Sequence, residues 1–247
     1  MGGQRITIET LYPEFGNQAG DNGNLMYLKA CLPDAEIVET AYGSEPAFAQ
    51  RDDISLILMG NMTERQQVQS LEALMPYRDR LDTLADRGLP MLFTGNAAEL
   101  LGSMIVTPQG QGHVGLGLFD FITHNNMPTR YTCACSGTFD PGDGADPYTV
   151  VGFKIQFTQV VARGKLAPFC TLDQGFGLSE GSVYEGVRKN HLLGTWMLGP
   201  ILPLNPYLVR SLLDWMDATS VPLAYEEVIQ DAYRERVRVF SQPGIVF

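Results

Sequence analysis

The sequence lacks long apolar runs and has little positive charge. In its 247 residues, no apolar segment approaches the ~20 residues that a membrane-spanning helix requires. The stretch MGGQRITIET has no apolar h-region, so no signal peptide is expected. Lysine and arginine number 17 against 28 acidic residues, which gives a net charge of −11. Nucleic acids and anionic membranes attract basic patches, so we expect neither as the main partner of this protein.

Cysteine is also scarce. The four cysteines are Cys31, Cys133, Cys135 and Cys170, and such sparse usage fits a reducing compartment. Cys133 and Cys135 are two residues apart, so on a strand they would share one face. Neither a Cys-x-x-Cys motif nor a matching pair of histidines is present, so we expect no metal site, and no cofactor is expected. These features together predict a cytoplasmic protein.

The composition and the first half of the chain indicate an α/β fold. Apolar residues make up 45% of the chain and charged residues 18%, which is enough for a buried core. Strand and helix patterns alternate, and ISLILM is apolar throughout, as in a strand buried on both faces. This order predicts a doubly wound, mostly parallel sheet flanked by helices. Strands are predicted at Arg5–Leu11, Ala35–Thr40, Ile54–Met59 and Leu89–Thr94, and helices at Asn24–Leu32, Glu64–Leu74, Tyr77–Arg87 and Ala97–Leu101.

The second half predicts shorter strands followed by two helices. The helices are expected at Pro206–Asp217, with Asn205 as the N-cap, and at Tyr225–Phe240. No linker divides the sequence, so we expect residues 1–247 to form one domain. The strands are predicted at Phe119–Thr123, Tyr131–Ser136, Tyr148–Phe157 and Val160–Ala162.

Two glycine turns fall where open α/β sheets bind ligands, at the carboxyl ends of strands. PMLFTGNAAELLG, residues 90–102, has the strand–turn–helix pattern of a nucleophile elbow, but the residue at the turn is Gly95. The second turn is GNMTERQQ, residues 60–67. Backbone N–H groups at such junctions can hold an oxyanion or a carboxylate. Ordinary strand–helix turns also use Gly and Asn, so the pattern alone leaves both readings open.

Three stretches resemble class I (triad-type) glutamine amidotransferases of the GatD-like and cobyric-acid-synthase-like branch. LYPEFGNQAGDNGNLMYLK, residues 11–29, resembles the opening segment of GatD-like proteins, and PMLFTGNAAELLG resembles the nucleophile elbow. GTWMLGPILPLNPYLVRSLL, residues 194–213, resembles the late segment that carries the catalytic histidine. The resemblance spans most of the chain and implies a flavodoxin-like core.

The sequence departs from this family at the catalytic positions. Without gaps, Gly95 falls where the resemblance implies the nucleophilic cysteine, and Leu198 falls where it implies the histidine. His191 lies seven residues before Leu198, and moving it into register would destroy the rest of that match. Glutamine hydrolysis in the family proceeds through a thioester and needs a thiolate with a base beside it. We therefore predict that glutaminase activity is absent.

Other expected positions line the same cleft. Asn61 and Met62 replace two glycines of the family's oxyanion loop, and Glu99 replaces a glutamine of its substrate pocket. Gln156 falls in the segment where the GatD-like branch carries Glu-Asn-His. The resemblance thus implies a cleft lined by Gly60, Asn61, Met62, Glu64, Asn96, Glu99 and Gln156.

These features leave several hypotheses about function. The first is a pseudoenzyme, a degenerate amidotransferase-like subunit that binds or regulates a Mur-ligase-like, amide-forming partner of cell-wall or cobyrinate type, or that forms a homo-oligomer. The second is an enzyme with other chemistry in the same cleft, using Glu64, Glu99 or His191 as acid or base. The third is an active amidotransferase with an unrecognised nucleophile. Both glutamates also suit helix amino termini, and His191 also suits a structural role.

Overall fold

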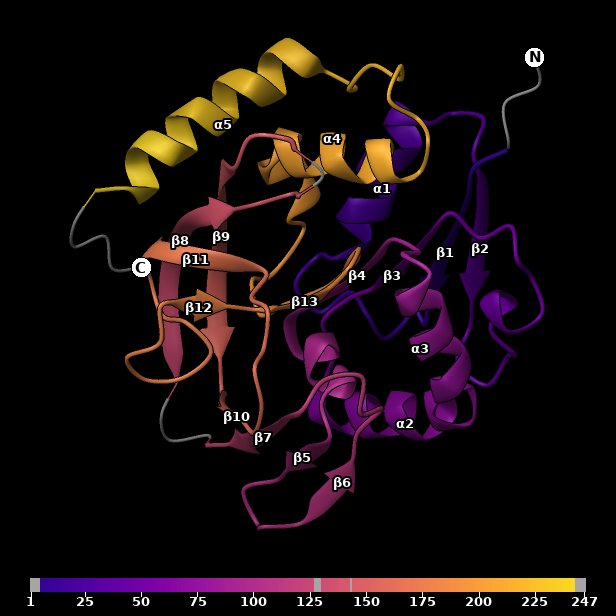
Figure 1. The fold of residues 1–247 in the computed structure, drawn as a ribbon, viewed down its shortest axis with the longest axis vertical. Helices are drawn as coiled ribbons and strands as arrows, with labels where there is room; N and C mark the ends of the chain where they lie inside the picture. The colour runs from indigo at the N-terminus through magenta and orange to yellow at the C-terminus, as the bar shows by residue number, and fades with distance from the viewer. Residues whose placement is uncertain (1–4, 127–129, 143, 243–247) are drawn as a thin grey trace.

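The computed structural model describes residues 5–126, 130–142 and 144–242 (Figure 1). Its helices are α1 (Asn22–Cys31), α2 (Glu64–Leu74), α3 (Arg78–Asp86), α4 (Pro206–Trp215) and α5 (Glu226–Phe240). Short 3₁₀ segments are η1 (Ala47–Ala49), η2 (Met75–Tyr77), η3 (Gly95–Leu101) and η4 (Leu202–Leu204). The strands are β1 (Thr7–Leu11), β2 (Glu36–Thr40), β3 (Leu56–Met59), β4 (Met91–Thr94), β5 (Met104–Val106), β6 (Gly112–Val114), β7 (Phe121–Asn125), β8 (Tyr131–Phe139), β9 (Tyr148–Gln156), β10 (Thr158–Ala162), β11 (Cys170–Gln174), β12 (Tyr184–Glu185), β13 (Val187–Lys189) and β14 (Leu192–Thr195).

The central sheet has the order β13-β14-β4-β3-β1-β2. All neighbouring strands pair in parallel except β13, which runs antiparallel to β14. Along the parallel part the order is that of flavodoxin-like folds, with β1 between β2 and β3 and with β4 and β14 following. The predicted fold class, a doubly wound sheet with a flavodoxin-like core, is confirmed.

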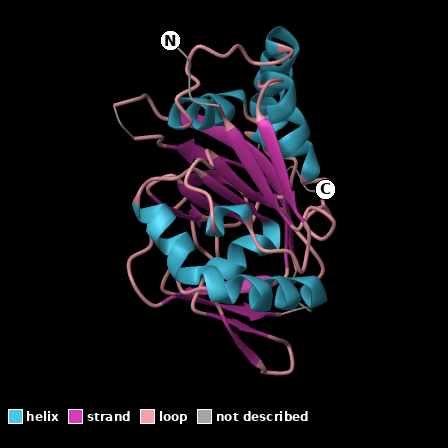
Figure 2. Cartoon of the chain, turned by 90° about the vertical axis from the view of Figure 1, so that its right-hand side faces the viewer, coloured by secondary structure: helices cyan, strands magenta, loops and turns pink. Residues whose placement is uncertain are grey.

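The strands of this sheet carry apolar residues on both faces because helices cover both faces (Figures 1 and 2). In β3, Leu56 and Leu58 belong to the cluster that includes residues of α1 and α4. Ile57 and Met59 point the other way, into the cluster that includes residues of α2 and α3. This two-sided packing explains the continuous apolar run that predicted the strand.

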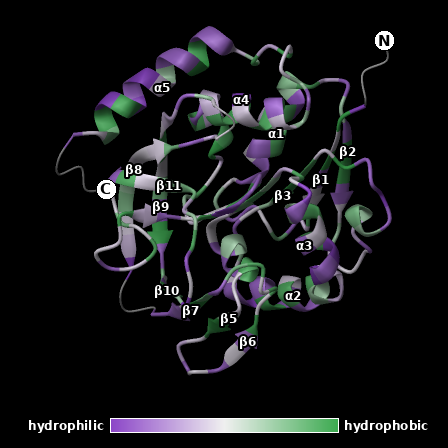
Figure 3. Cartoon of the chain, viewed as in Figure 1, coloured by the Kyte–Doolittle hydropathy of each residue, from purple (hydrophilic) through white to green (hydrophobic). Residues whose placement is uncertain are grey.

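Two four-stranded sheets complete the structure, in the orders β10-β7-β5-β6 and β12-β11-β8-β9. The helix α5 packs on β8 and β9, and hydrophobic and hydrophilic residues alternate along it (Figure 3). From α5, Tyr233 donates its hydroxyl hydrogen to the Thr149 carbonyl at 2.6 Å, and Phe240 packs edge-on against Phe153. In the described part of the chain, no helix is both long enough and apolar enough to cross a bilayer.

Most predicted elements are confirmed, and three details differ. The helix expected at Ala97–Leu101 is part of the 3₁₀ segment η3. Asn205 occupies the N-cap position of α4 without capping it, because its amide bonds both backbone groups of Val151 and the Ile201 carbonyl. Strands β5, β6 and β11–β14 were not predicted.

Candidate active-site cleft

A cavity of about 200 Å³, here called the cleft, lies at the carboxyl ends of β3, β4 and β14. It contains Gly95 and Leu198, which come from segments about a hundred residues apart in the chain. Six of the seven expected cleft-lining residues are also there. The cleft is lined by Gln18, Asn61, Met62, Glu64, Gln67, Gly95, Asn96, Glu99, Asn125, Ile155, Gln156, Phe157, Thr158, Trp196 and Leu198.

Gly95 forms the sharp turn between β4 and η3. Its φ of +60° lies in the left-handed region, which glycine enters without strain. A Cβ atom added at this position would lie 2.5 Å from Asn61 Oδ1 and 2.6 Å from Asn61 Cβ. The Asn61 side chain therefore occupies the space that any side chain at position 95 would need. The preceding Thr94 is also engaged, since its hydroxyl donates to Asp21 Oδ1 at 2.5 Å.

Asn61 and Asn96 join the loop after β3 to the loop after β4. The Asn96 backbone N–H donates to Asn61 Oδ1 at 3.0 Å, and the Met62 backbone N–H donates to Asn96 Oδ1 at 2.9 Å. The Asn96 amide also donates to the Met62 carbonyl at 2.7 Å. In nucleophile elbows, an oxyanion is held by the N–H that follows the nucleophile and by an N–H from a neighbouring loop. Here the two equivalent donors, the backbone N–H groups of Asn96 and Met62, already donate to asparagine side-chain oxygens.

Glu99 is a buried carboxyl at the back of the cleft, only 3% exposed. It accepts hydrogen bonds from Thr158 Oγ1 at 2.6 Å, Gln67 Nε2 at 3.0 Å and Trp196 Nε1 at 3.2 Å. Burial raises the pKa of Glu99, and these three hydrogen bonds oppose the rise. Gln67 Nε2 is itself fixed by a second bond to the Asn96 carbonyl at 2.7 Å. The carboxyl thus holds together elements that form three sides of the cleft.

A fully buried ion pair lies behind this carboxyl. Lys154 Nζ is 2.5 Å from Glu185 Oε2, and both side chains have no exposed surface. Glu185 Oε1 also accepts from Thr195 Oγ1 at 2.7 Å and from the Trp196 backbone N–H at 2.8 Å. The remaining Lys154 protons are donated to the carbonyls of Phe176 and Gly177. The pair therefore fixes Trp196, whose indole reaches Glu99.

The structure places two of the expected site residues away from the lining of the cleft. Gly60 does not line the cleft, because it is packed behind it, where an added Cβ would lie 2.0 Å from the Gly16 carbonyl oxygen. His191 lies just before β14, at the opposite end of the strands from the cleft. Its Nδ1 is 2.8 Å from the Gly88 carbonyl oxygen, and its ring stacks on Trp215 at 4.2 Å. It therefore cannot act as an acid or base in the cleft.

Several lining residues were not predicted. Gln67 follows Glu64 by three residues on α2, so the helical spacing could have identified it as a second residue on the same face. Thr158 and Trp196 follow strands whose pairing depends on distant residues, and the sequence carries no local signal for either. Trp196 reaches the cleft because β14 pairs in parallel with β4, which places Thr195 beside Thr94.

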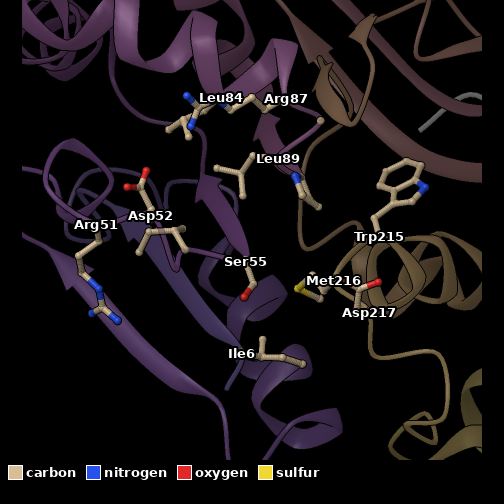
Figure 4. A pocket seen from close by; sticks show the side chains of 13 residues that line it. Ile6, Arg51, Asp52, Ser55, Leu84, Arg87, Leu89, Trp215, Met216 and Asp217 are labelled. Atoms are coloured by element: carbon tan, nitrogen blue, oxygen red, sulfur yellow. The ribbon is translucent and has the colours of Figure 1, made fainter. Parts of the chain in front are cut away.

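A second cavity, of about 380 Å³, lies at the amino ends of the parallel strands (Figure 4). Trp215, Met216 and Asp217 line it from the end of α4, and Ile6, Arg51, Asp52 and Ser55 line it from the sheet side. Two of its charged residues, Arg51 and Asp52, form ion pairs near the surface. Arg51 contacts Glu36 and Asp53, both at 2.7 Å, and Asp52 contacts Arg80 at 2.7 Å.

Comparisons with known proteins agree with this fold. No family model matches the chain. The GatD subunit of lipid II isoglutaminyl synthase (glutamine-hydrolyzing) from Staphylococcus aureus is 26% identical over 231 residues, which cover 92% of this chain and 91% of that protein. The protein of the same name from Streptococcus pneumoniae is 23% identical over 228 residues, covering 92% and 84%.

Solved structures show the same fold. PurLQS from Thermotoga maritima superposes with a TM-score of 0.52 and 11% identity, over 87% of this chain and 98% of the matched chain. A glutamine amidotransferase superposes with a TM-score of 0.52 and 16% identity, over 85% and 98%. The sheet order and the elbow thus define a class I glutamine amidotransferase-like fold. Both curated relatives that the chain resembles over 92% of its length are GatD subunits.

Proposed function

We propose that this chain is a GatD-like subunit that does not hydrolyse glutamine and that acts by binding an amide-forming, Mur-ligase-like partner. The observation that carries the proposal is the position of Asn61. Its side chain lies 2.5 to 2.7 Å from where the Cβ of a nucleophile at position 95 would be. Real Cβ atoms do not approach neighbours so closely, so a cysteine at this position requires Asn61 to move.

The hydrogen bonds around the elbow also support the absence of hydrolysis. A tetrahedral oxyanion would need the N–H groups of Asn96 and Met62, and these already bond to asparagine side-chain oxygens. Leu198, at the position implied for the histidine, offers no proton acceptor. Its backbone N–H bonds to the Phe153 carbonyl at 2.7 Å, which fixes the residue beside the cleft. Glu99 is already bonded by three donors, so we do not propose another acid–base chemistry through it.

A partner surface is supported by apolar side chains beside the cleft. Along β9, Lys154 and Gln156 point inward, whereas Phe153 and Ile155 are exposed by 39% and 45%. Phe157 and Leu198 are half-buried beside them. Exposed apolar side chains that gather in one place are typical of interaction sites. The relatives are named as subunits of a lipid II isoglutaminyl synthase, and the resemblance implies a Mur-ligase-like synthetase as the other subunit.

The absence of hydrolysis is tested by ammonia release from glutamine. The wild type should stay at background because Gly95 offers no thiol. Gly95→Cys, alone or with Leu198→His, should also stay there because Asn61 obstructs the turn. Adding Asn61→Gly to the double variant removes the obstruction and tests whether the blocked turn is the main barrier. Each variant is first checked for a cooperative melt. Steady turnover by the wild type, alone or with a copurified partner, would overturn this part of the proposal.

The partner is tested by sedimentation and by copurification from the native cell with mass spectrometry. We expect a stable complex with a Mur-ligase-like protein or, without it, a homo-oligomer. Ile155→Asp should weaken the association by at least about tenfold, because it places a charge in an apolar contact. Val114→Asp, a change at an exposed valine on β6, is the matched control. A strict monomer that retains no Mur-ligase-like protein counts decisively against this surface.

A further inference from the structure

Cys133 and Cys135 bring two sulfur atoms together on one face of β8. Their Sγ atoms are 3.4 Å apart, and both residues belong to the same buried cluster. On the neighbouring strand β9, Lys154 lies opposite Cys133 and Gly152 lies opposite Cys135. The expectation that both cysteines share one face is confirmed. Their proximity makes this a dithiol rather than two unrelated core residues.

The loop that follows β11 closes over this dithiol. The Phe176 backbone N–H donates to Cys133 Sγ at 3.4 Å. Gly175 has a φ of +104°, and an added Cβ there would lie 2.6 Å from Cys135 Sγ. Position 175 is therefore restricted to glycine by both its backbone conformation and the neighbouring sulfur. The loop fits around the pair and supplies one hydrogen bond to it.

The two sulfurs differ in environment. Cys133 is 8% exposed, whereas Cys135 has no exposed surface. The hydrogen bond from Cys135, the Phe176 N–H and the Lys154 ammonium together lower the pKa of Cys133. The hydrogen bond with Cys133, together with burial, raises the pKa of Cys135. Glu185, bonded to Lys154, opposes the effect of the ammonium on Cys133. The less buried of the two cysteines is thus the one whose thiolate is stabilised.

We propose that Cys133 and Cys135 form a reversible redox site that reacts with small hydroperoxides. The Cys133 thiolate attacks the outer peroxide oxygen, the O–O bond breaks, and the leaving oxygen takes a proton, which gives a sulfenic acid at Cys133. The Cys135 sulfur then attacks Cys133 Sγ, the S–O bond breaks, and water leaves with the Cys135 proton. The two sulfurs lose two electrons to the peroxide. The products are a disulfide, one water from the sulfenic acid, and the alcohol or water left by the peroxide.

The strand geometry makes this disulfide reversible. On a strand, the Cα atoms of residues i and i+2 are about 6.6 Å apart, which is near the upper end of the Cα–Cα range of disulfides. Bond formation brings the sulfurs from 3.4 Å to about 2 Å and strains β8. Strained disulfides are the ones that thiols reduce readily, and transient disulfides are the kind that occur in reducing compartments.

The site also connects to the cleft. Lys154 bonds the carbonyls of Phe176 and Gly177, in the loop over the dithiol, and pairs with Glu185. Glu185 in turn accepts from the Trp196 backbone N–H, and the Trp196 indole lines the cleft. A shift of the loop on oxidation therefore acts first on Lys154. Through its ion pair with Glu185, it then acts on Trp196.

The test is thiol counting after treatment with hydrogen peroxide. The wild type has four cysteines, all free, so alkylation under denaturing conditions should fall from four labels to two after oxidation. Peptide mapping should place the disulfide between residues 133 and 135, and dithiothreitol should restore all four labels. Cys135→Ser should accumulate a sulfenic acid that dimedone traps at Cys133. Cys133→Ser should slow thiol loss by about tenfold or more, because the stabilised thiolate is gone.

Cys170→Ser is the matched control, because Cys170 is buried in the same cluster. It should leave the oxidation of the dithiol unchanged. Cys133→Ala and melting curves separate a loss of reactivity from a loss of fold. The proposal is overturned if the wild type keeps four labels, if Cys31 and Cys170 react as fast as Cys133, or if the Cys133 variants oxidise at the wild-type rate.

Discussion

The two ends of the central sheet are held together by different kinds of interaction. At the carboxyl ends of the strands, buried groups such as Lys154, Glu185 and Glu99 are bonded to several partners each. At the amino ends, Arg51 and Lys189 form ion pairs with carboxylates that are partly exposed to solvent. Water and salt weaken exposed ion pairs. Removing one partner of a buried pair strongly lowers the free energy of unfolding, because the other charge stays buried without a counter-ion.

This difference shows where the structure is fixed most firmly. On the function proposed above, the cleft keeps a hydrogen-bonded wall without glutaminase chemistry. We infer that these bonds then preserve the shape of a surface rather than the position of a nucleophile. If this interpretation is correct, equivalent substitutions at the two ends should have very different effects.

The largest effect is expected from a matched pair of lysine variants. Lys154→Met leaves Glu185 buried without its counter-ion and should lower the free energy of unfolding by about 3–5 kcal/mol. Lys189→Met removes a cation that contacts Asp82 and Asp86, whose side chains are 48% and 61% exposed. It should lower stability by about 0–1 kcal/mol. Urea denaturation of both variants measures the difference, and equal losses would contradict the comparison.

A smaller effect is expected from removing one amide at each end. Asn96→Ala leaves the Met62 N–H and carbonyl without their partners and should lower stability by about 1–3 kcal/mol. Gln50→Ala, in the loop before β3, removes only an exposed hydrogen bond to Glu45. That variant should stay within about 0.5 kcal/mol of the wild type. A near-neutral Asn96→Ala would mean that the two loops are not held by this amide.

Glu99 should make stability depend on pH. Its pKa is raised in the folded protein, so its contribution is fully present below the ordinary value of 4.5 and is lost as pH rises through the raised pKa. Relative to Glu99→Gln, the wild type should therefore lose stability as pH rises above 4.5. Denaturation of both proteins across this range tests the sign. A difference that does not vary with pH would show that Glu99 titrates as in the unfolded chain.

The smallest effect is expected at the amino ends. Arg51 lowers the pKa of both Glu36 and Asp53 through direct hydrogen bonds. Arg51→Met should return both values toward their ordinary range, which carboxyl-carbon NMR titration measures. The stabilising contribution of these carboxylates is present above their unfolded pKa and is lost as pH falls through the lowered one. Salt should weaken it further, and a salt-independent contribution would argue against exposed pairing.

The sequence predicted the central sheet well because its signals are local. Continuous apolar residues in β3 and the periodic pattern of α2 identify those elements without knowledge of the rest of the chain. Strands such as β13 and β14 have three and four residues, and distant partners define them. For the same reason Trp196 was missed, although it lies in the cleft.

The sequence predicted residues that line the candidate site, but it did not predict the contacts between them. The sequence identified Asn61 and Asn96 as cleft residues. It gave no sign that Asn61 accepts the Asn96 backbone N–H or that Asn96 accepts the backbone N–H of Met62. That arrangement depends on two loops meeting in space. His191 was misplaced for the same reason, since its distance along the chain from Leu198 gives no information about which end of a strand it occupies.

The two tryptophans of the chain happen to divide between the two ends of the sheet. Trp196 is 2% exposed and bonds Glu99 in the cleft, whereas Trp215 lines the opposite cavity and stacks on His191. Each end therefore carries its own built-in fluorophore. With Trp215→Phe, emission from Trp196 reports partner binding at the cleft or oxidation of the dithiol that connects to it. With Trp196→Phe, emission reports only the far side. A single spectrometer can thus follow each end of this molecule separately.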